Sequence, residues 1–144
     1  MTNQLITSRG EAVSPEALAS AAVLRALRNN GRPGERPEEV LLDLGLVSEH
    51  DLALELALAS QRPFCGLRGF SPDPRLFLYL PVHVALRERL CPLVMIGDSM
   101  KLATAFIDPD LTYLTERFPK LELELVVATR GDILGALEYV ARRA

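Results

Sequence analysis

The chain has 144 residues, a formal net charge of −3 at pH 7, 49% apolar residues and 24% charged residues. This length suits one domain or two small subdomains, and the composition is that of a globular protein rather than a disordered one. The negative net charge argues against a general nucleic-acid surface, which needs clustered positive charge. We therefore expect a globular protein that binds no nucleic acid polymer.

Neither the N-terminus nor any apolar run carries an export or membrane signal. Residues 1–8 lack a basic region followed by an apolar stretch. The densest apolar run, Leu52 to Ala59, holds Glu55 and is too short to span a bilayer. Two cysteines without an export signal, here Cys65 and Cys91, are typical of buried, reduced thiols. We expect a cytoplasmic protein with no direct membrane insertion.

The N-terminal part of the chain predicts three helices. Ser14 is followed by a proline, which is typical of a helix start, and the Gly- and Pro-containing turn at 29–34 ends that helix. A second helix begins at Pro37 and ends at Gly45, and Ser48 caps a third. The third helix is apolar most of the way round, so we expect it to lie inside the fold or against a partner.

The C-terminal part of the chain predicts a small sheet covered by helices. Residues 62–74 are rich in Pro and Gly and mark a boundary. Beyond them, Gly97-Asp98 predicts a hairpin turn between two apolar runs. The expected elements are helical turns at 75–79 and 82–88, strands at 90–96, 100–106 and 121–127, and helices at 108–118 and 129–143.

These elements predict an α+β fold, with an N-terminal three-helix bundle followed by a small β-β-α-β-α subdomain. The expected division is a helical subdomain at 1–61, a linker with short helices at 62–89, and an α/β subdomain at 90–144.

Motifs for catalysis and metal binding are weak. The sequence has no G-x-x-x-x-G-K-[ST] loop and so no phosphate cradle of an ATPase. His83, Cys65 and Cys91 supply three metal ligands only if the fold gathers them, and buried thiols are the simpler interpretation. Asp108 and Asp110 are better explained by a turn and a helix cap than by a carboxylate pair. We expect no catalytic residues, no metal and no enzyme activity.

Four segments resemble, in order, the N-terminal domain of type II secretion and type IV pilus assembly ATPases, the MshEN-like domains. RPEEVLLDLGLVSEHDLALELALASQ, beginning at Arg36, is similar to the family unit R-L-G-x-x-L-L-x-x-G-L-I-S-x-x-x-L-x-x-x-L-x-x-Q. The later segments are LPVHVALRERLCPL, LATAFIDPDL and LELELVVATRGDILGALEYV. The resemblance covers about Ser14 to Val140 and depends on the ordered set rather than on one motif.

In this family the domain docks a cytoplasmic ATPase to the inner-membrane platform of a secretion or pilus machine. The resemblance therefore implies a non-catalytic regulatory or adaptor protein, here without the ATPase, that acts through protein–protein contacts. The implied partner is a secretion, pilus or motility component.

An alternative implied by the resemblance is a cyclic di-GMP receptor module with a degenerate motif. In related MshEN domains two copies of the unit wrap this messenger, with the arginine stacked on a guanine and leucines packed on its faces. No other cofactor is expected. The matching positions in this chain are Arg36, Leu41, Leu42, Gly45, Leu52 and Leu56.

The match to the ligand-binding unit is partial. The family's leucine, glycine and glutamine positions hold Pro37, Glu38 and Ala59, and a first copy near residues 2–25 matches at few positions. Glu38 places negative charge where a dianionic ligand approaches the backbone. The competing interpretation is that the motif leucines form the core of a helical hairpin.

Overall fold

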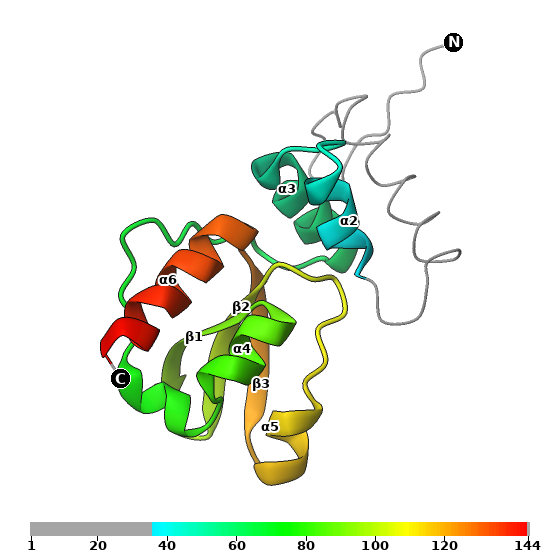
Figure 1. Ribbon diagram of the computed structural model, residues 1–144. Helices are drawn as coiled ribbons and strands as arrows, with labels where there is room; N and C mark the ends of the chain where they lie inside the picture. Colours follow the sequence, from blue (N-terminus) through cyan, green and yellow to red (C-terminus); the bar gives the residue numbers. More distant parts are fainter. Residues whose placement is uncertain (1–35, 144) are drawn as a thin grey trace.

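The computed structural model describes residues 36–143 (Figure 1). Mixed helices and a three-stranded sheet confirm the α+β class. The first predicted helix and the first copy of the motif lie outside the described residues. The elements are α2 (Pro37–Asp43), α3 (Glu49–Ser60), the 3-10 helix η1 (Pro74–Leu78), α4 (Val82–Glu88), β1 (Leu90–Ile96), β2 (Ser99–Thr104), α5 (Thr112–Arg117), β3 (Glu122–Val127) and α6 (Arg130–Arg143).

Helices α2 and α3 form a short hairpin, which we call the helical hairpin. Pro37 occupies the first turn of α2, where its missing N–H is not needed. Gly45 adopts φ +69° in the connecting turn, a conformation that glycine reaches without strain. The Ser48 hydroxyl then accepts a hydrogen bond from the Asp51 N–H at 3.1 Å, which confirms the predicted cap of α3.

The sheet has the order β1-β2-β3. Strands β1 and β2 form the predicted antiparallel hairpin, with Ile96 opposite Ser99 and Gly97 at φ +59° in the turn. Strand β3 runs parallel to β2, so α5 serves as the crossover that a parallel pair requires. This crossover helix is shorter than predicted and begins at Thr112, because the chain from Ile107 to Leu111 forms an irregular loop.

The segment that follows α3 extends the sheet at the end of β3. Phe64 forms a parallel bridge with Val127. The Val127 N–H donates to the Pro63 carbonyl at 2.8 Å, and the Cys65 N–H donates to the Val127 carbonyl at 2.7 Å. This segment therefore acts as a very short additional strand and connects the helical hairpin to the sheet.

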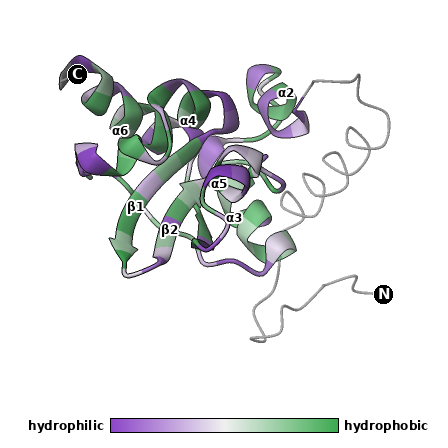
Figure 2. Cartoon of the chain, turned by 90° about the horizontal axis from the view of Figure 1, so that it is seen from below, coloured by the Kyte–Doolittle hydropathy of each residue, from purple (hydrophilic) through white to green (hydrophobic). Residues whose placement is uncertain are grey.

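The main core lies between the sheet and its helices. Helices α4 and α6 contact one another and β1, and Figure 2 shows hydrophobic residues along β1 and β2. Residues of η1 and α4 belong to this core, so the region predicted to be a linker is packed against the sheet. The largest fully buried members are Leu80, Val84, Leu90, Met100, Leu102, Leu114, Ile133 and Leu137.

The helical hairpin has a second, smaller core that borrows from the sheet. Its buried members are Leu41, Leu52, Ala53, Leu56 and, from β3, Val127. The hairpin thus packs on the end of the sheet rather than forming an independent unit. Within residues 36–143, no helix is long and apolar enough to cross a membrane.

Candidate functional site

The motif leucines lie mainly in the small core of the helical hairpin. Leu41, Leu52 and Leu56 have side chains 0 to 3% exposed and pack together. Leu42 is half-buried at the edge of this core. Gly45 lies in the turn, and a Cβ added to it would meet no atom within 4 Å apart from those of Gly45 and its two chain neighbours. These residues therefore have structural roles in the hairpin.

Arg36, the remaining candidate, has its contacts outside the leucine core. Its guanidinium Nη2 donates to Oε1 of Glu88 at 2.6 Å, and Nη1 donates to the carbonyl of Asp108 at 2.6 Å. The guanidinium carbon also lies 4.7 Å from the ring centroid of Phe106, a cation–π distance. The structure thus separates Arg36 from Leu41, Leu52 and Leu56, and surrounds it with partners from the α/β part of the chain.

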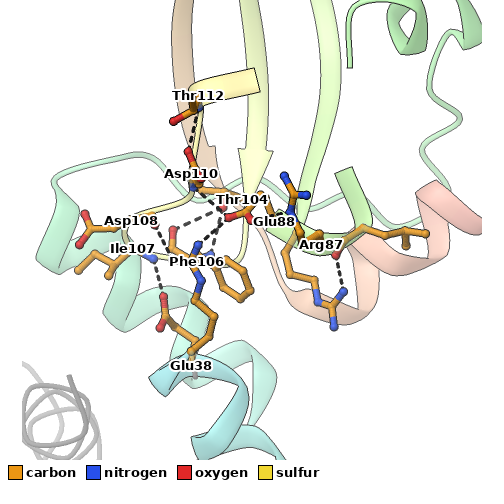
Figure 3. Close-up of polar contacts among 12 residues, drawn as sticks. Glu38, Arg87, Glu88, Thr104, Phe106, Ile107, Asp108, Asp110 and Thr112 are labelled. Atoms are coloured by element: carbon orange, nitrogen blue, oxygen red, sulfur yellow. Dashed lines mark hydrogen bonds and ion pairs between the residues drawn. The ribbon is translucent and has the colours of Figure 1, made fainter. Parts of the chain in front are cut away.

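Glu88 is the buried acceptor at the end of α4. Its side chain is 7% exposed and accepts hydrogen bonds from Arg36, from Nε of Arg87 at 3.2 Å and from the Asp110 N–H at 3.0 Å. A buried carboxylate costs free energy unless its charge is paired and its oxygens accept hydrogen bonds. Glu88 meets both conditions, with two arginines and one backbone N–H (Figure 3).

Glu38 makes a contact that the sequence reasoning missed. The side chain is 2% exposed, and its Oε2 accepts a hydrogen bond from the Ile107 N–H at 2.7 Å (Figure 3). Ile107 is also held at its carbonyl, which accepts a hydrogen bond from Nη1 of Arg62 at 3.0 Å. The residue that departs from the glycine of the motif therefore has a partner 69 positions further along the chain.

Together, the four side chains Arg36, Glu38, Arg62 and Glu88 hold the loop of residues 107–111, and we call them the polar clasp. Two carboxylates accept from backbone N–H groups of the loop, while two guanidinium groups donate to its carbonyls. Because buried or partly buried peptide groups need partners, the clasp fixes the loop between the helical hairpin and α4.

A second ionic group lies between the hairpin and α6. Nη1 of Arg130 lies 2.6 Å from Glu39 and 3.1 Å from Asp43, and Nε lies 3.6 Å from Glu49. Glu39 also pairs with Arg89 at 2.6 Å. Partial burial alone lowers the pKa of Arg130, but the hydrogen bonds and charges of Glu39 and Asp43 outweigh it and raise the pKa above its ordinary value. Arg130 therefore stays charged and joins α6 to the hairpin through Glu39, Asp43 and Glu49.

The other candidate residues have structural explanations. Asp110 accepts from the Thr112 N–H at 2.9 Å in the turn before α5, and this hydrogen bond lowers its pKa. The predicted turn is thus present, but the predicted cap was wrong, because the N-cap residue of α5 is Leu111, which makes no side-chain cap hydrogen bond. Cys91 is buried as predicted, and burial raises the pKa of its thiol to about 12. Cys65 was predicted to be buried, but this thiol is only half-buried beside the short bridge to β3.

In the part of the chain that the structure describes, no three His, Cys, Asp or Glu side chains lie close enough to hold a metal ion.

The helical hairpin exposes four leucines, Leu44, Leu46, Leu54 and Leu58, and we call them together the leucine surface. Leu54 and Leu58 are one turn apart on α3, on the side opposite the buried Leu52 and Leu56. This arrangement explains why the helix is apolar most of the way round. The exposed fractions are 66% for Leu44, 59% for Leu46, 41% for Leu54 and 46% for Leu58.

Comparison with known proteins defines the class of this chain. The solved N-terminal domain of XpsE has a TM-score of 0.59 and 26% sequence identity, covering 88% of this chain and 86% of that one. A solved structure of MshE with cdg has a TM-score of 0.59 and 29% identity, covering 88% of both chains. The fold is thus that of the N-terminal domains of these proteins.

The particular family follows from the sequence profile of the MshEN domain, which matches residues 60–144, more than half of the chain. The chain belongs to the MshEN domain family, as its ordered segments predicted. No curated protein matches the sequence. The profile match begins at the end of α3, so it leaves the candidate residues from Arg36 to Leu56 outside the matched region.

Proposed function

We propose that this MshEN domain is a non-catalytic regulatory or adaptor module that acts in the cytoplasm and binds a protein partner through the leucine surface. The observation that carries this proposal is the exposure of four leucines on one hairpin, Leu44, Leu46, Leu54 and Leu58. Exposed leucines that gather on one element are typical of interaction sites, whereas single exposed apolar residues need no explanation. The partner we propose is a component of a secretion, pilus or motility machine.

The roles of the motif residues support a docking module over a ligand pocket. Leu41, Leu52 and Leu56 are buried in the hairpin core, and Arg36 already has a carboxylate, a carbonyl and an aromatic ring as partners. A ligand that uses these groups has to displace contacts within the chain. A protein that contacts the exposed parts of Leu54 and Leu58 covers apolar surface that otherwise faces solvent.

The test measures binding of the full-length chain to purified secretion, pilus and motility components. We expect the double substitution Leu54→Ser with Leu58→Ser to weaken binding at least tenfold, because burying the exposed parts of two leucine side chains contributes on the order of 1.5 kcal/mol. Leu78→Ser is the matched control, since Leu78 is 82% exposed on η1 outside the hairpin. Unchanged binding by the double variant, or no binding to any such component, would overturn the proposal.

The second candidate function is a cyclic di-GMP receptor, and the similarity to MshE with cdg over 88% of the chain favours it. Arg36 is retained, and about a third of its side chain remains exposed. Isothermal titration calorimetry with cyclic di-GMP tests this function, with Arg36→Ala as the variant. No heat at high micromolar ligand excludes the receptor, and equal binding by the variant excludes Arg36 as a ligand-binding residue.

A further inference from the structure

The polar clasp brings anionic groups of the chain itself to the one retained cation of the ligand motif. Glu88 binds Nη2 of Arg36 at 2.6 Å, and Phe106 lies against the guanidinium at 4.7 Å. Both an edge and a face of the guanidinium are therefore occupied. These are the surfaces that a phosphate and an aromatic base, respectively, use to bind arginine.

We propose that the Arg36–Glu88 ion pair is an autoinhibitory contact that closes the candidate nucleotide site. An anionic ligand gains little from Arg36 while Glu88 neutralises it, and the buried carboxylate also repels the incoming negative charge. This inference rests on the second candidate function and names how that site is regulated. Glu88 is not a ligand-binding residue in this proposal but a competitor for Arg36.

The same contact couples the site to the loop of residues 107–111. Arg36 donates to the Asp108 carbonyl, and Glu88 accepts from the Asp110 N–H at 3.0 Å. When a ligand takes Arg36, the Asp108 carbonyl loses its donor, and Oε1 of Glu88, which Arg36 and the Asp110 N–H share, is left free to turn away from the Asp110 N–H. Glu38 and Arg62 still hold Ile107, because their bonds to it use neither Arg36 nor Glu88. Ligand binding therefore loosens the end of the loop nearest α5 while its beginning stays fixed.

The test is a calorimetric titration of the full-length chain with cyclic di-GMP, comparing the wild type with Glu88→Gln. The variant lacks the charge-assisted hydrogen bond between Arg36 and the competing carboxylate, so the ligand does not have to break that bond. We therefore expect the variant to bind cyclic di-GMP roughly tenfold more tightly. A merely structural role of Glu88 predicts the opposite, since damage to the clasp weakens binding. Inorganic pyrophosphate in a parallel titration shows whether the site accepts any phosphate or requires the bases.

Glu138→Gln is the matched control, because it removes the same charge from an exposed pair with Arg142 on α6. An equal gain in this control would mean that net charge, rather than the contact with Arg36, sets the affinity, and this overturns the inference. Glu88→Asp provides a second variant that keeps the buried charge but draws it back from Arg36, and we expect an intermediate gain. Circular dichroism establishes that each variant is folded.

The outcomes separate this inference from the receptor function. If the wild type binds and Glu88→Gln binds no better, the autoinhibitory contact is excluded and the receptor function stands. If neither chain binds, both are excluded. Hydrogen exchange adds a check on coupling: ligand should speed exchange of the Asp110 amide and leave that of Ile107 unchanged, and equal protection of Asp110 with and without ligand contradicts the coupling.

Discussion

The helical hairpin and the α/β part of this domain are held together by different forces. The α/β core is large and contains fully buried residues from the sheet and from its covering helices. The hairpin has five buried residues in its core, of which Val127 belongs to β3. Its other attachments are the backbone bridge at Phe64 and charged contacts, through the polar clasp on one side and Arg130 on the other. The hairpin therefore depends on the sheet, whereas most of the sheet's core does not involve the hairpin.

This difference predicts two levels of stability in one chain. Apolar burial of the α/β part sets the free energy of global unfolding, while the hairpin can open with a smaller free energy. Such local opening is useful in a docking module, because the part that meets the partner is the part that moves most readily. The predictions that follow test this division.

The largest effect is expected for Leu102→Ala. Leu102 is fully buried in β2, between strands β1 and β3. Its truncation should lower the free energy of global unfolding by about 3 kcal/mol, through lost burial and a cavity. Urea denaturation measures this. Val94→Ala is the control, since Val94 is 41% exposed in β1, and equal effects of the two changes would contradict the location of the core.

Leu56→Ala should act mainly on the hairpin. Leu56 is 1% exposed, and its contacts lie in the small core. We expect the free energy of local opening of α3 to fall by about 2 kcal/mol. Native-state hydrogen exchange reads the α3 amides separately from those of β2. If the amides of β2 lose as much protection as those of α3, the two parts unfold as one and the division is wrong.

Alkaline pH should weaken the α/β core through Cys91. The pKa of about 12 in the folded state lies above the thiol's ordinary value of 9.0 because burial disfavours the thiolate. Below pH 9 both the folded and unfolded states hold the proton; between pH 9 and 12 only the folded state does, so stability falls as pH rises. The loss is about 1.4 kcal/mol at pH 10. Denaturation of Cys91→Ala at pH 8 and pH 10 isolates this effect, and an equal pH dependence in the variant contradicts it.

The smallest effect is expected for Asp43→Asn. Asp43 lies 3.1 Å from Arg130, but its side chain is 68% exposed, so solvent screens most of the attraction. We expect the free energy of hairpin opening to change by less than about 0.5 kcal/mol, and by less still at high salt. Hydrogen exchange of the α3 amides measures it. A larger change would mean that the outer ion pairs, and not the small core, hold the hairpin.

Local signals in the sequence predicted much of the fold. The Ser48 cap, the turn at Gly97 and the alternation in β3 depend on neighbouring residues, so they could be read without the structure. The start of α5 was placed too early, because the irregular loop before it is fixed by distant partners: Arg36 binds the Asp108 carbonyl from 72 positions away.

The candidate site could be predicted only in part for the same reason. The helical spacing of Leu52 and Leu56 fitted both a ligand-binding face and a core face, and the structure places them in the core. Glu38 was interpreted as an unfavourable departure from glycine, yet it accepts a hydrogen bond from Ile107. Nothing near Glu38 in the sequence indicates this bond, because the loop that supplies the N–H is brought to it only by the folded sheet.

The short bridge at Phe64 has a consequence for how copies of this domain behave at high concentration. An open strand edge offers unpaired backbone groups to other chains and promotes aggregation. Phe64 covers the end of β3 at Val127, and the strand's earlier part carries Glu122 and Glu124, which are exposed and repel a like edge. The residues that tether the hairpin to the sheet thereby also protect this edge, so a change that detaches the hairpin endangers solubility as well as recognition.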